Sequence, residues 1–186
     1  MLQKFMLLTA LIAVAGCDSD EITESEAGIE RIRETMSIYS DVAKAQAAGY
    51  TVWSPDPLAA GATCPSSADG KMGYHLVNVS LRGAATNPQA GDAVLDPNKP
   101  EMLLYEKRAD GTMALVGVEW LVFKAAWERE KGVGAAPPTV LGVPVPLSEH
   151  TFAAGGPLIP HYELHAWVFK TNPRGTFEPY HPNVTC

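Results

Sequence analysis

The fold of this chain is decided by residues 101–123, whose sequence is EMLLYEKRADGTMALVGVEWLVF. Two apolar runs, 101–107 and 112–123, flank the dipeptide Asp110-Gly111. An Asp-Gly pair between two such runs is a strong signal for a β-hairpin, because its residues adopt the positive φ angles of a tight turn. This stretch therefore predicts two adjacent antiparallel strands.

The segments on either side of this hairpin extend the pattern. Apolar residues at three- and four-residue steps predict one amphipathic helix over residues 26–48, ended by Gly49; its apolar stripe is Ile29, Ile32, Met36, Tyr39 and Ala43. Further predicted elements are strands at 73–81 and 161–170, a short helix at 124–131, and loops at 50–67, 84–100 and 132–157, the last with room for a brief strand. The fold class is α+β: a single domain with one N-terminal amphipathic helix packed on a mainly antiparallel sheet, with long Pro- and Gly-rich loops.

The first 16 residues have the features of an export signal. Lys4 precedes an apolar run that is shorter than the about 20 residues needed to span a bilayer. Val14-Ala15-Gly16-Cys17 matches a lipobox, in which the chain is cut before the cysteine and its thiol is acylated. An ordinary cleaved signal that happens to end before a cysteine is the alternative. The prediction is a lipoprotein anchored to a membrane through lipid (palmitate) on Cys17.

This prediction divides the chain into a signal peptide (1–16), a lipidated N-terminus with a charged tether (17–26) and one globular domain (27–186). Asp18 resembles an inner-membrane retention signal, but the rule is not universal. The periplasmic side of the inner membrane, the outer membrane and the cell surface therefore all stay open as locations. The only partner predicted here is a membrane, bound through the lipid.

Charge excludes one class of partner. The chain carries 14 Lys and Arg against 21 Asp and Glu, a net charge of −7. Removing residues 1–16 takes away one further positive charge, Lys4, and leaves −8 on 170 residues. Nucleic-acid binding needs a cluster of Lys and Arg to neutralise phosphates, and no such cluster is present in the sequence.

Two cysteines remain once Cys17 is assigned to lipid: Cys64 and Cys186. Disulfides persist in exported proteins, so these two cysteines are predicted to pair and to fasten the C-terminal segment to the domain. Free or metal-binding thiols are the alternative, although no CxxC spacing supports a metal site.

Three ionisable residues, His75, Glu119 and His165, lie inside apolar runs on three predicted strands. A buried carboxylate without a partner is costly, so it is expected to contact a cation, a metal ion or a proton. The three side chains can converge at one point on a face of the sheet. We therefore predict that they bind one transition-metal ion, such as zinc, copper or iron, which imidazole and carboxylate ligands suit.

Strand parity adds a fourth candidate. His161, Glu163 and His165 share one face of the last predicted strand. Residues two apart lie about 7 Å apart, so Glu163 is predicted to be a fourth ligand beside His165 or a hydrogen-bonding partner of the ligands; His161, about 13 Å from His165, is less suited. HYELH (161–165) is only superficially similar to the zinc motif HExxH, because its glutamate stands at the third position.

Two other interpretations remain open. In one, the strand histidines are hydrogen-bonded core residues, Glu119 pairs with Arg82 or Lys124, and the protein is a non-enzymatic envelope-binding module that uses the Pro-rich segment 132–160. In the other, the tryptophans line a small-molecule pocket. His150 and His181 lie in Pro-rich segments and are predicted to be solvated. No motif specifies an enzymatic reaction, so whether the protein is an enzyme stays open.

The chain resembles a family of uncharacterised bacterial secreted proteins over most of residues 40–186. The blocks that carry the resemblance are 45–50, Gly73-Tyr74-His75, 100–106, Val118-Glu119-Trp120, Glu163-Leu164-His165-Ala166-Trp167, 172–177 and Asn183-Val184-Thr185-Cys186. The resemblance implies that His75, Glu119, His165 and the cysteine pair belong to a shared pattern. It supplies no substrate.

Overall fold

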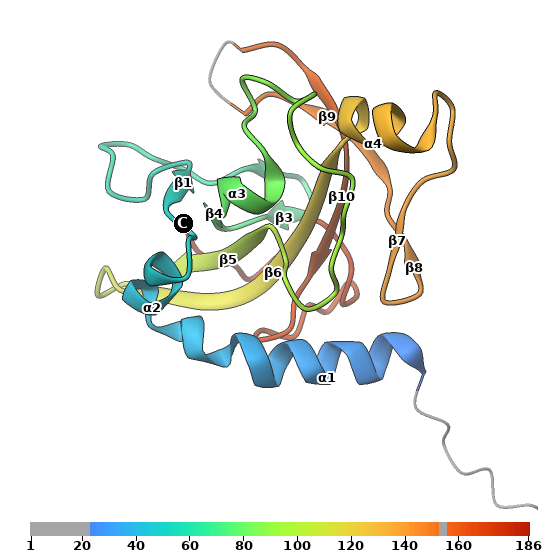
Figure 1. Cartoon of the computed structure of the whole chain (residues 1–186). Helices are drawn as coiled ribbons and strands as arrows, with labels where there is room; N and C mark the ends of the chain where they lie inside the picture. Colours follow the sequence, from blue (N-terminus) through green and yellow to red (C-terminus); the bar gives the residue numbers. More distant parts are fainter. Residues whose placement is uncertain (1–22, 153–155) are drawn as a thin grey trace, which may run out of the picture.

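The computed structural model describes residues 23–152 and 156–186 (Figure 1). The predicted signal peptide, Cys17 and most of the tether lie outside the described residues and remain predictions. Within the described residues, every helix is too short or too polar to cross a membrane.

One antiparallel sheet forms the centre of the domain. In the described part of the chain it has six strands, in the order β1-β4-β5-β6-β10-β9. These strands are β1 (Val52–Ser54), β4 (Tyr74–Val77), β5 (Met102–Lys107), β6 (Met113–Phe123), β9 (Leu147–His150) and β10 (Ile159–Ala166). Two short hairpins lie beside the sheet: β2 (Ser66–Ser67) with β3 (Gly70–Lys71), and β7 (Thr139–Val140) with β8 (Val143–Pro144). The predicted β5–β6 hairpin and the α+β class are confirmed.

The N-terminal helical segment is broken where one helix was predicted. It consists of α1 (Glu24–Met36), the 3₁₀ turn η1 (Ser37–Ser40) and α2 (Val42–Ala47). Thr23 and Glu26 form a capping box at the start of α1. Asp41 has an extended backbone, and its carboxylate accepts a hydrogen bond from the backbone N–H of Ala43 at 2.9 Å. This local bond starts a new helix, so the continuous helix over 26–48 was wrong.

The strand at 73–81 was predicted too long for the same kind of reason. Asn78 ends β4 and caps the short helix α3 (Val79–Arg82), with its Oδ1 accepting from the N–H of Ser80 at 3.1 Å. Helix α4 (Lys124–Lys131) has the predicted bounds. The predicted loop at 132–157 contains β7, β8 and β9.

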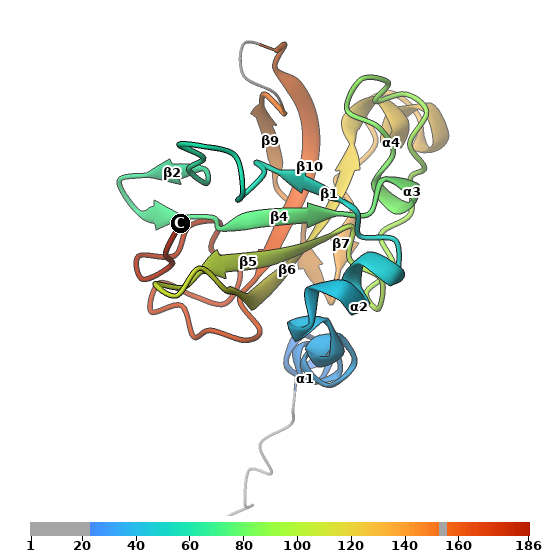
Figure 2. The ribbon, with the colours of Figure 1, turned by 90° about the vertical axis from the view of Figure 1, so that its left-hand side faces the viewer.

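The two faces of the sheet have different roles. One face packs on α1 and α2 and holds the main core, to which Ile32 of α1 and Trp120 of β6 belong. The opposite face carries smaller apolar clusters and is partly covered by α3 and α4. The sheet twists so strongly that β4 runs nearly across β10 (Figure 2), which brings side chains from distant strands together on this second face.

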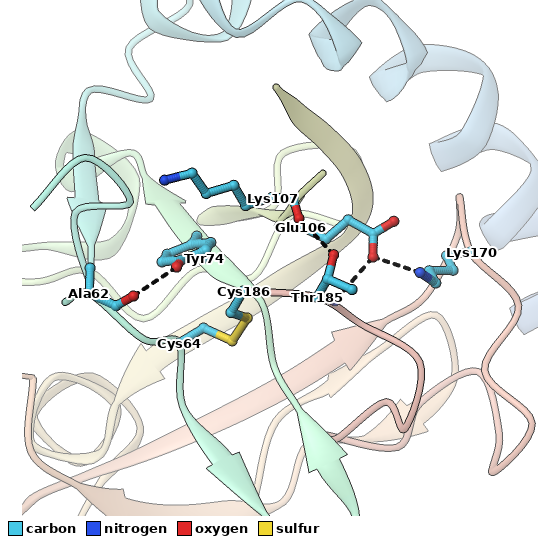
Figure 3. Close-up of a disulfide and its surroundings, with 8 residues drawn as sticks. All are labelled: Ala62, Cys64, Tyr74, Glu106, Lys107, Lys170, Thr185 and Cys186. Carbon is cyan, nitrogen blue, oxygen red and sulfur yellow. Dashed lines mark hydrogen bonds and ion pairs between the residues drawn. A yellow bond between two sulfur atoms is a disulfide. The ribbon is translucent and has the colours of Figure 1, made fainter. Parts of the chain in front are cut away.

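The predicted disulfide between Cys64 and Cys186 is present (Figure 3), with the two Cα atoms 5.8 Å apart. The preceding residue, Thr185, donates from Oγ1 to the carbonyl of Lys107 at 2.7 Å and from its N–H to Glu106. The C-terminal segment is therefore fastened both to β5 and to the 55–65 segment.

Candidate metal centre

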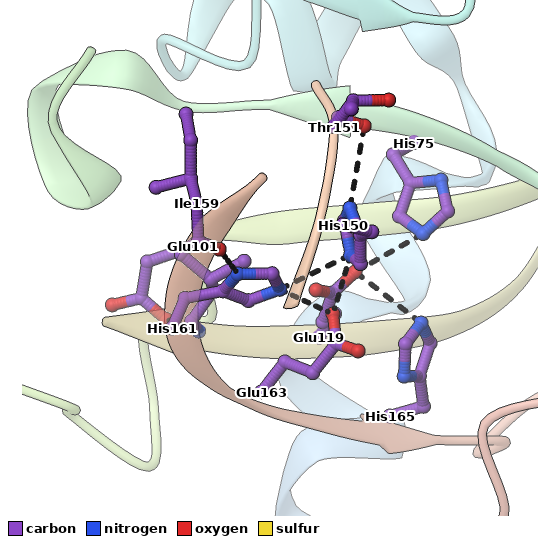
Figure 4. Close-up of polar contacts among 10 residues, drawn as sticks. His75, Glu101, Glu119, His150, Thr151, Ile159, His161, Glu163 and His165 are labelled. Atoms are coloured by element: carbon purple, nitrogen blue, oxygen red, sulfur yellow. Dashed lines mark hydrogen bonds and ion pairs between the residues drawn. The ribbon is translucent and has the colours of Figure 1, made fainter. Parts of the chain in front are cut away.

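His75, Glu119 and His165, called here the Glu119 group, converge on the second face of the sheet (Figure 4). His165 of β10 stands opposite Glu119 of β6 in the strand register. His75 lies on β4, which is separated from β6 by β5, and reaches Glu119 because the sheet is curled. The predicted convergence of the three side chains is therefore found in the structure.

The ligand atoms of this group face one another at short range. The Nε2 atom of His75 lies 3.1 Å from Oε2 of Glu119, and Nε2 of His165 lies 3.4 Å from the same oxygen. The two imidazole rings are nearly perpendicular, with centroids 5.8 Å apart. One ligand atom from each residue lies within 4.8 Å of the other two, so a single ion can contact all three.

Two of these atoms have no hydrogen-bond partner among the described residues: Oε2 of Glu119 and Nε2 of His165. The two side chains are only 2 % and 1 % exposed, so bulk solvent has little access to these atoms. Leaving a buried polar atom unpaired costs about 1–3 kcal/mol. A cation between the three residues would satisfy both atoms.

Burial sets the charge of the Glu119 group. It lowers the pKa of His75 to about 4 and also lowers the pKa of His165. Burial raises the pKa of Glu119 to about 7. Both imidazoles are therefore neutral near pH 7, the form in which histidine binds a metal.

Glu163 belongs to a different cluster, called here the Glu163 group, with His150 and His161. Its Oε2 lies 3.3 Å from Nε2 of His150 and 3.2 Å from Nε2 of His161, and the two nitrogens are 3.1 Å apart. The structure thus places Glu163 beside His161 and not among the converging atoms of the Glu119 group. Its role as a ligand remains a prediction.

The outer nitrogens of the two histidines determine what faces Glu163. Nδ1 of His161 donates to the carbonyl of Ile159 at 2.6 Å, and Nδ1 of His150 donates to the carbonyl of Thr151 at 3.4 Å. When these histidines are neutral, both Nε2 atoms are therefore acceptors, and three acceptors meet. Either a second proton on His150 or a metal ion can satisfy them.

The pKa shifts in the Glu163 group favour an ionised Glu163 beside a protonated His150. Although burial acts to raise it, hydrogen bonds from His150 and His161 hold the pKa of Glu163 well below its ordinary range. Burial acts to lower the pKa of His150, but the hydrogen bond to Glu163 raises it overall. His150 was predicted to be solvated; its side chain is 41 % exposed and hydrogen-bonded within this group.

Both groups open on one cavity of about 620 Å³. His75 and Glu119 line it from one group, and His150 and Glu163 from the other. Cys64 of the disulfide forms part of its wall. Trp53 is the one tryptophan among the residues that line it, so the alternative of a pocket built from several tryptophans does not describe this cavity.

The predicted structural ion pairs of Glu119 are not seen among the described residues. Lys124 instead pairs with Glu128 on its own helix at 2.6 Å, and the carboxylate contacts of Glu119 are the two histidines. His181 was predicted to be solvated but is fully buried: Nε2 donates to the Thr171 carbonyl, and Nδ1 accepts from the N–H of Asn183. It lies outside both groups.

Comparison of the chain with protein-family models, with curated proteins and with solved structures finds no match. The resemblance to bacterial secreted proteins therefore stays a prediction.

Proposed function

We propose that the domain binds a transition-metal ion through His75, Glu119 and His165. The observation that supports this most directly is the pair of buried, unpartnered ligand atoms in the Glu119 group, which point toward a common position. Two imidazoles and one carboxylate suit zinc or iron, and copper to a lesser degree.

The cavity favours a metal-dependent reaction over simple metal storage. Three protein ligands leave coordination positions open, as catalytic metal sites require, and the Glu119 group borders a space large enough for a small molecule. The ion would polarise a bound water or substrate there. Glu163, whose pKa is held low, is a weak base and is less suited to proton abstraction.

The test is elemental analysis of the purified protein without a histidine tag, as isolated and after exposure to zinc, iron or copper. We expect about one tightly held equivalent of a single metal, lost in both His75→Ala and His165→Ala. His181→Ala, which removes a buried histidine outside both groups, should keep it. A wild-type protein that holds none of these metals would rule out the proposal.

A second, weaker ion position is favoured at the Glu163 group by its three converging acceptors. An ion must displace the proton that otherwise satisfies His150 and Glu163, so binding there should be weaker. Titration with excess metal should reveal a second equivalent that His161→Ala removes while the first is kept. A single equivalent at saturation would leave the Glu163 group with a purely hydrogen-bonded role.

We also propose that the protein is exported and anchored through lipid on Cys17. The lipobox supports this, and the Cys64–Cys186 disulfide is typical of oxidising compartments. Mass spectrometry of the mature N-terminus should find an acylated Cys17. A Cys17→Ser variant should accumulate uncut and without lipid; an unmodified cysteine in the mature wild-type protein would contradict the proposal.

A further inference from the structure

Arg82 is a buried cation on the wall of the same cavity. It is the last residue of α3, a helix fixed by the Asn78 cap, and only 7 % of it is exposed. Its guanidinium lies over two aromatic rings, 5.8 Å from the centroid of Phe123 and 5.3 Å from that of Phe152. Such packing fixes the plane of the guanidinium and leaves its edge available for hydrogen bonds.

No carboxylate forms an ion pair with this guanidinium in the described part of the chain, although the charge of Glu119 acts on it from farther away. The ion pairs of the described arginines involve Arg33, Arg129 and Arg174, and none reaches Arg82 within 4.0 Å. Its one side-chain hydrogen bond to a described residue runs from Nε to the carbonyl of Gly83 at 3.2 Å. No described residue accepts a hydrogen bond from the terminal Nη groups, whereas buried arginines ordinarily use these donors in bidentate pairs.

The charges around the cavity determine which ligand fits. Without metal, Glu119 and Glu163 face the space together with Arg82, and an anion gains little by entering. A divalent ion in the Glu119 group makes the sum of these charges positive. An anionic ligand would then find a cation at the metal position and a second cation at Arg82.

We propose that the metal-loaded cavity binds a small oxyanion, a carboxylate or a phosphate-type group, whose oxygens accept hydrogen bonds from the Nη groups of Arg82. This assigns the substrate class of the site and rests on the proposed function for the contribution of the ion. The two terminal nitrogens match the spacing of paired oxygens in either kind of group.

Calorimetric titration of zinc-loaded protein with acetate and, in a separate arm, with inorganic phosphate tests the proposal. We expect one of the two anions to bind at a single site, and Arg82→Gln to weaken that binding at least about tenfold with metal content unchanged. Arg82→Lys keeps the charge but loses the paired donors, so it should fall between. Arg174→Gln, which removes an exposed arginine paired with Asp69, is the matched control and should bind as wild type does.

Failure of this proposal and failure of the proposed function give different results. Normal metal content with no anion binding, or with binding that Arg82→Gln leaves intact, overturns the anion site alone. If no metal binds, the same anions are titrated into the metal-free protein. Anion binding that depends on Arg82 would then support the anion site without the metal, and absence of anion binding would overturn the anion site.

Should Arg82→Gln fail to fold, the test uses labelled wild-type protein. The Nε–H resonance of Arg82 must then shift when the anion is added.

Discussion

The Glu119 group and the Glu163 group each consist of two histidines and one glutamate. They differ in the hydrogen bonds that these side chains make. In the Glu119 group, a carboxylate oxygen and an imidazole nitrogen are buried and have no hydrogen-bond partner in the described part of the chain. In the Glu163 group, the carboxylate lies within hydrogen-bond distance of two histidines, each histidine is oriented by a main-chain carbonyl, and a second proton on His150 can be donated to the carboxylate.

The comparison shows that two clusters built from the same residue types can have different roles. Two histidines and a glutamate that are satisfied by one shared proton form a stable polar cluster, whereas the same residues with orphaned atoms carry a cost that a bound cation removes. The Glu119 group also draws on three strands of the sheet, whereas the Glu163 group draws on the β9–β10 hairpin.

The largest expected effect comes from removing the disulfide in the cavity wall. It tests whether this wall or the sheet holds the two groups in place. Replacing both cysteines, Cys64→Ala with Cys186→Ala, removes a cross-link that spans 122 residues. We expect a loss of about 4–5 kcal/mol in the free energy of unfolding, measured by denaturant titration. Metal content at low temperature should be unchanged, because the ligands lie on strands. Loss of metal from a folded variant would show that the wall positions the groups.

The next effect concerns the ion in the Glu119 group. At free metal about 1,000 times above its Kd, binding stabilises the native state by about 4 kcal/mol, which raises Tm by roughly 8–16 °C. Differential scanning calorimetry with metal or with chelator should show this shift in wild type and in His161→Ala. The shift should vanish in His165→Ala. Equal shifts in both variants would remove the distinction between the groups.

A matched pair of carboxylate substitutions in metal-free protein should give opposite signs. Glu163→Gln loses the charge-assisted hydrogen bond from His150 and should destabilise by about 1.5–3 kcal/mol. Glu119→Gln removes a buried, unpaired carboxylate and should be neutral or stabilising. Chemical denaturation in chelator measures both. Destabilisation of similar size in the two variants would mean that Glu119 is already satisfied.

The smallest expected effect tests how burial shifts the pKa of Glu101, a carboxylate outside both groups. Burial raises the pKa of Glu101 well above its ordinary value, although its Oε2 accepts from the N–H of Leu121 at 3.0 Å. As the pH rises, Glu101 therefore ionises in the unfolded chain before it ionises in the folded protein. The free energy of unfolding falls accordingly above about pH 4.3.

Glu101→Gln keeps an acceptor for Leu121 and removes this titration. Its stability relative to wild type should therefore increase as the pH rises above about 4.3, by at most about 1.4 kcal/mol per pH unit. Unfolding curves of both proteins at several pH values provide the measurement. A constant difference across that range would show that burial does not shift Glu101.

The three residues of the Glu119 group were predictable because each is an ionisable side chain inside an apolar strand. Their placement on three predicted strands then allowed them to converge on one face of the sheet. Their unsatisfied atoms were not predictable, since these depend on side-chain angles and on the curl of the sheet.

The Glu163 group escaped prediction because parity identifies a face and not the neighbour across it. His150 lies on β9, a strand inside a Pro-rich segment with no clear alternation, and only the β9–β10 register brings it to Glu163. Asp41 and Asn78 broke a predicted helix and a predicted strand through local side-chain bonds that periodicity does not detect. Arg82 was considered only as a partner of Glu119, because nothing in the sequence indicated two phenylalanine rings beside it.

The strand order has a consequence for the timing of metal capture. β10 is the last strand in the chain but lies inside the sheet, between β6 and β9, and it supplies a histidine or a carboxylate to both groups. His75 and His165 are therefore brought together only by long-range pairing, whose loop-closure entropy must be overcome before the two side chains can meet. A partly folded chain presents no complete set of ligands. Under the proposed function, an ion would therefore be bound only by a nearly finished domain, and metals that bind loosely to unfolded histidines would not occupy the site.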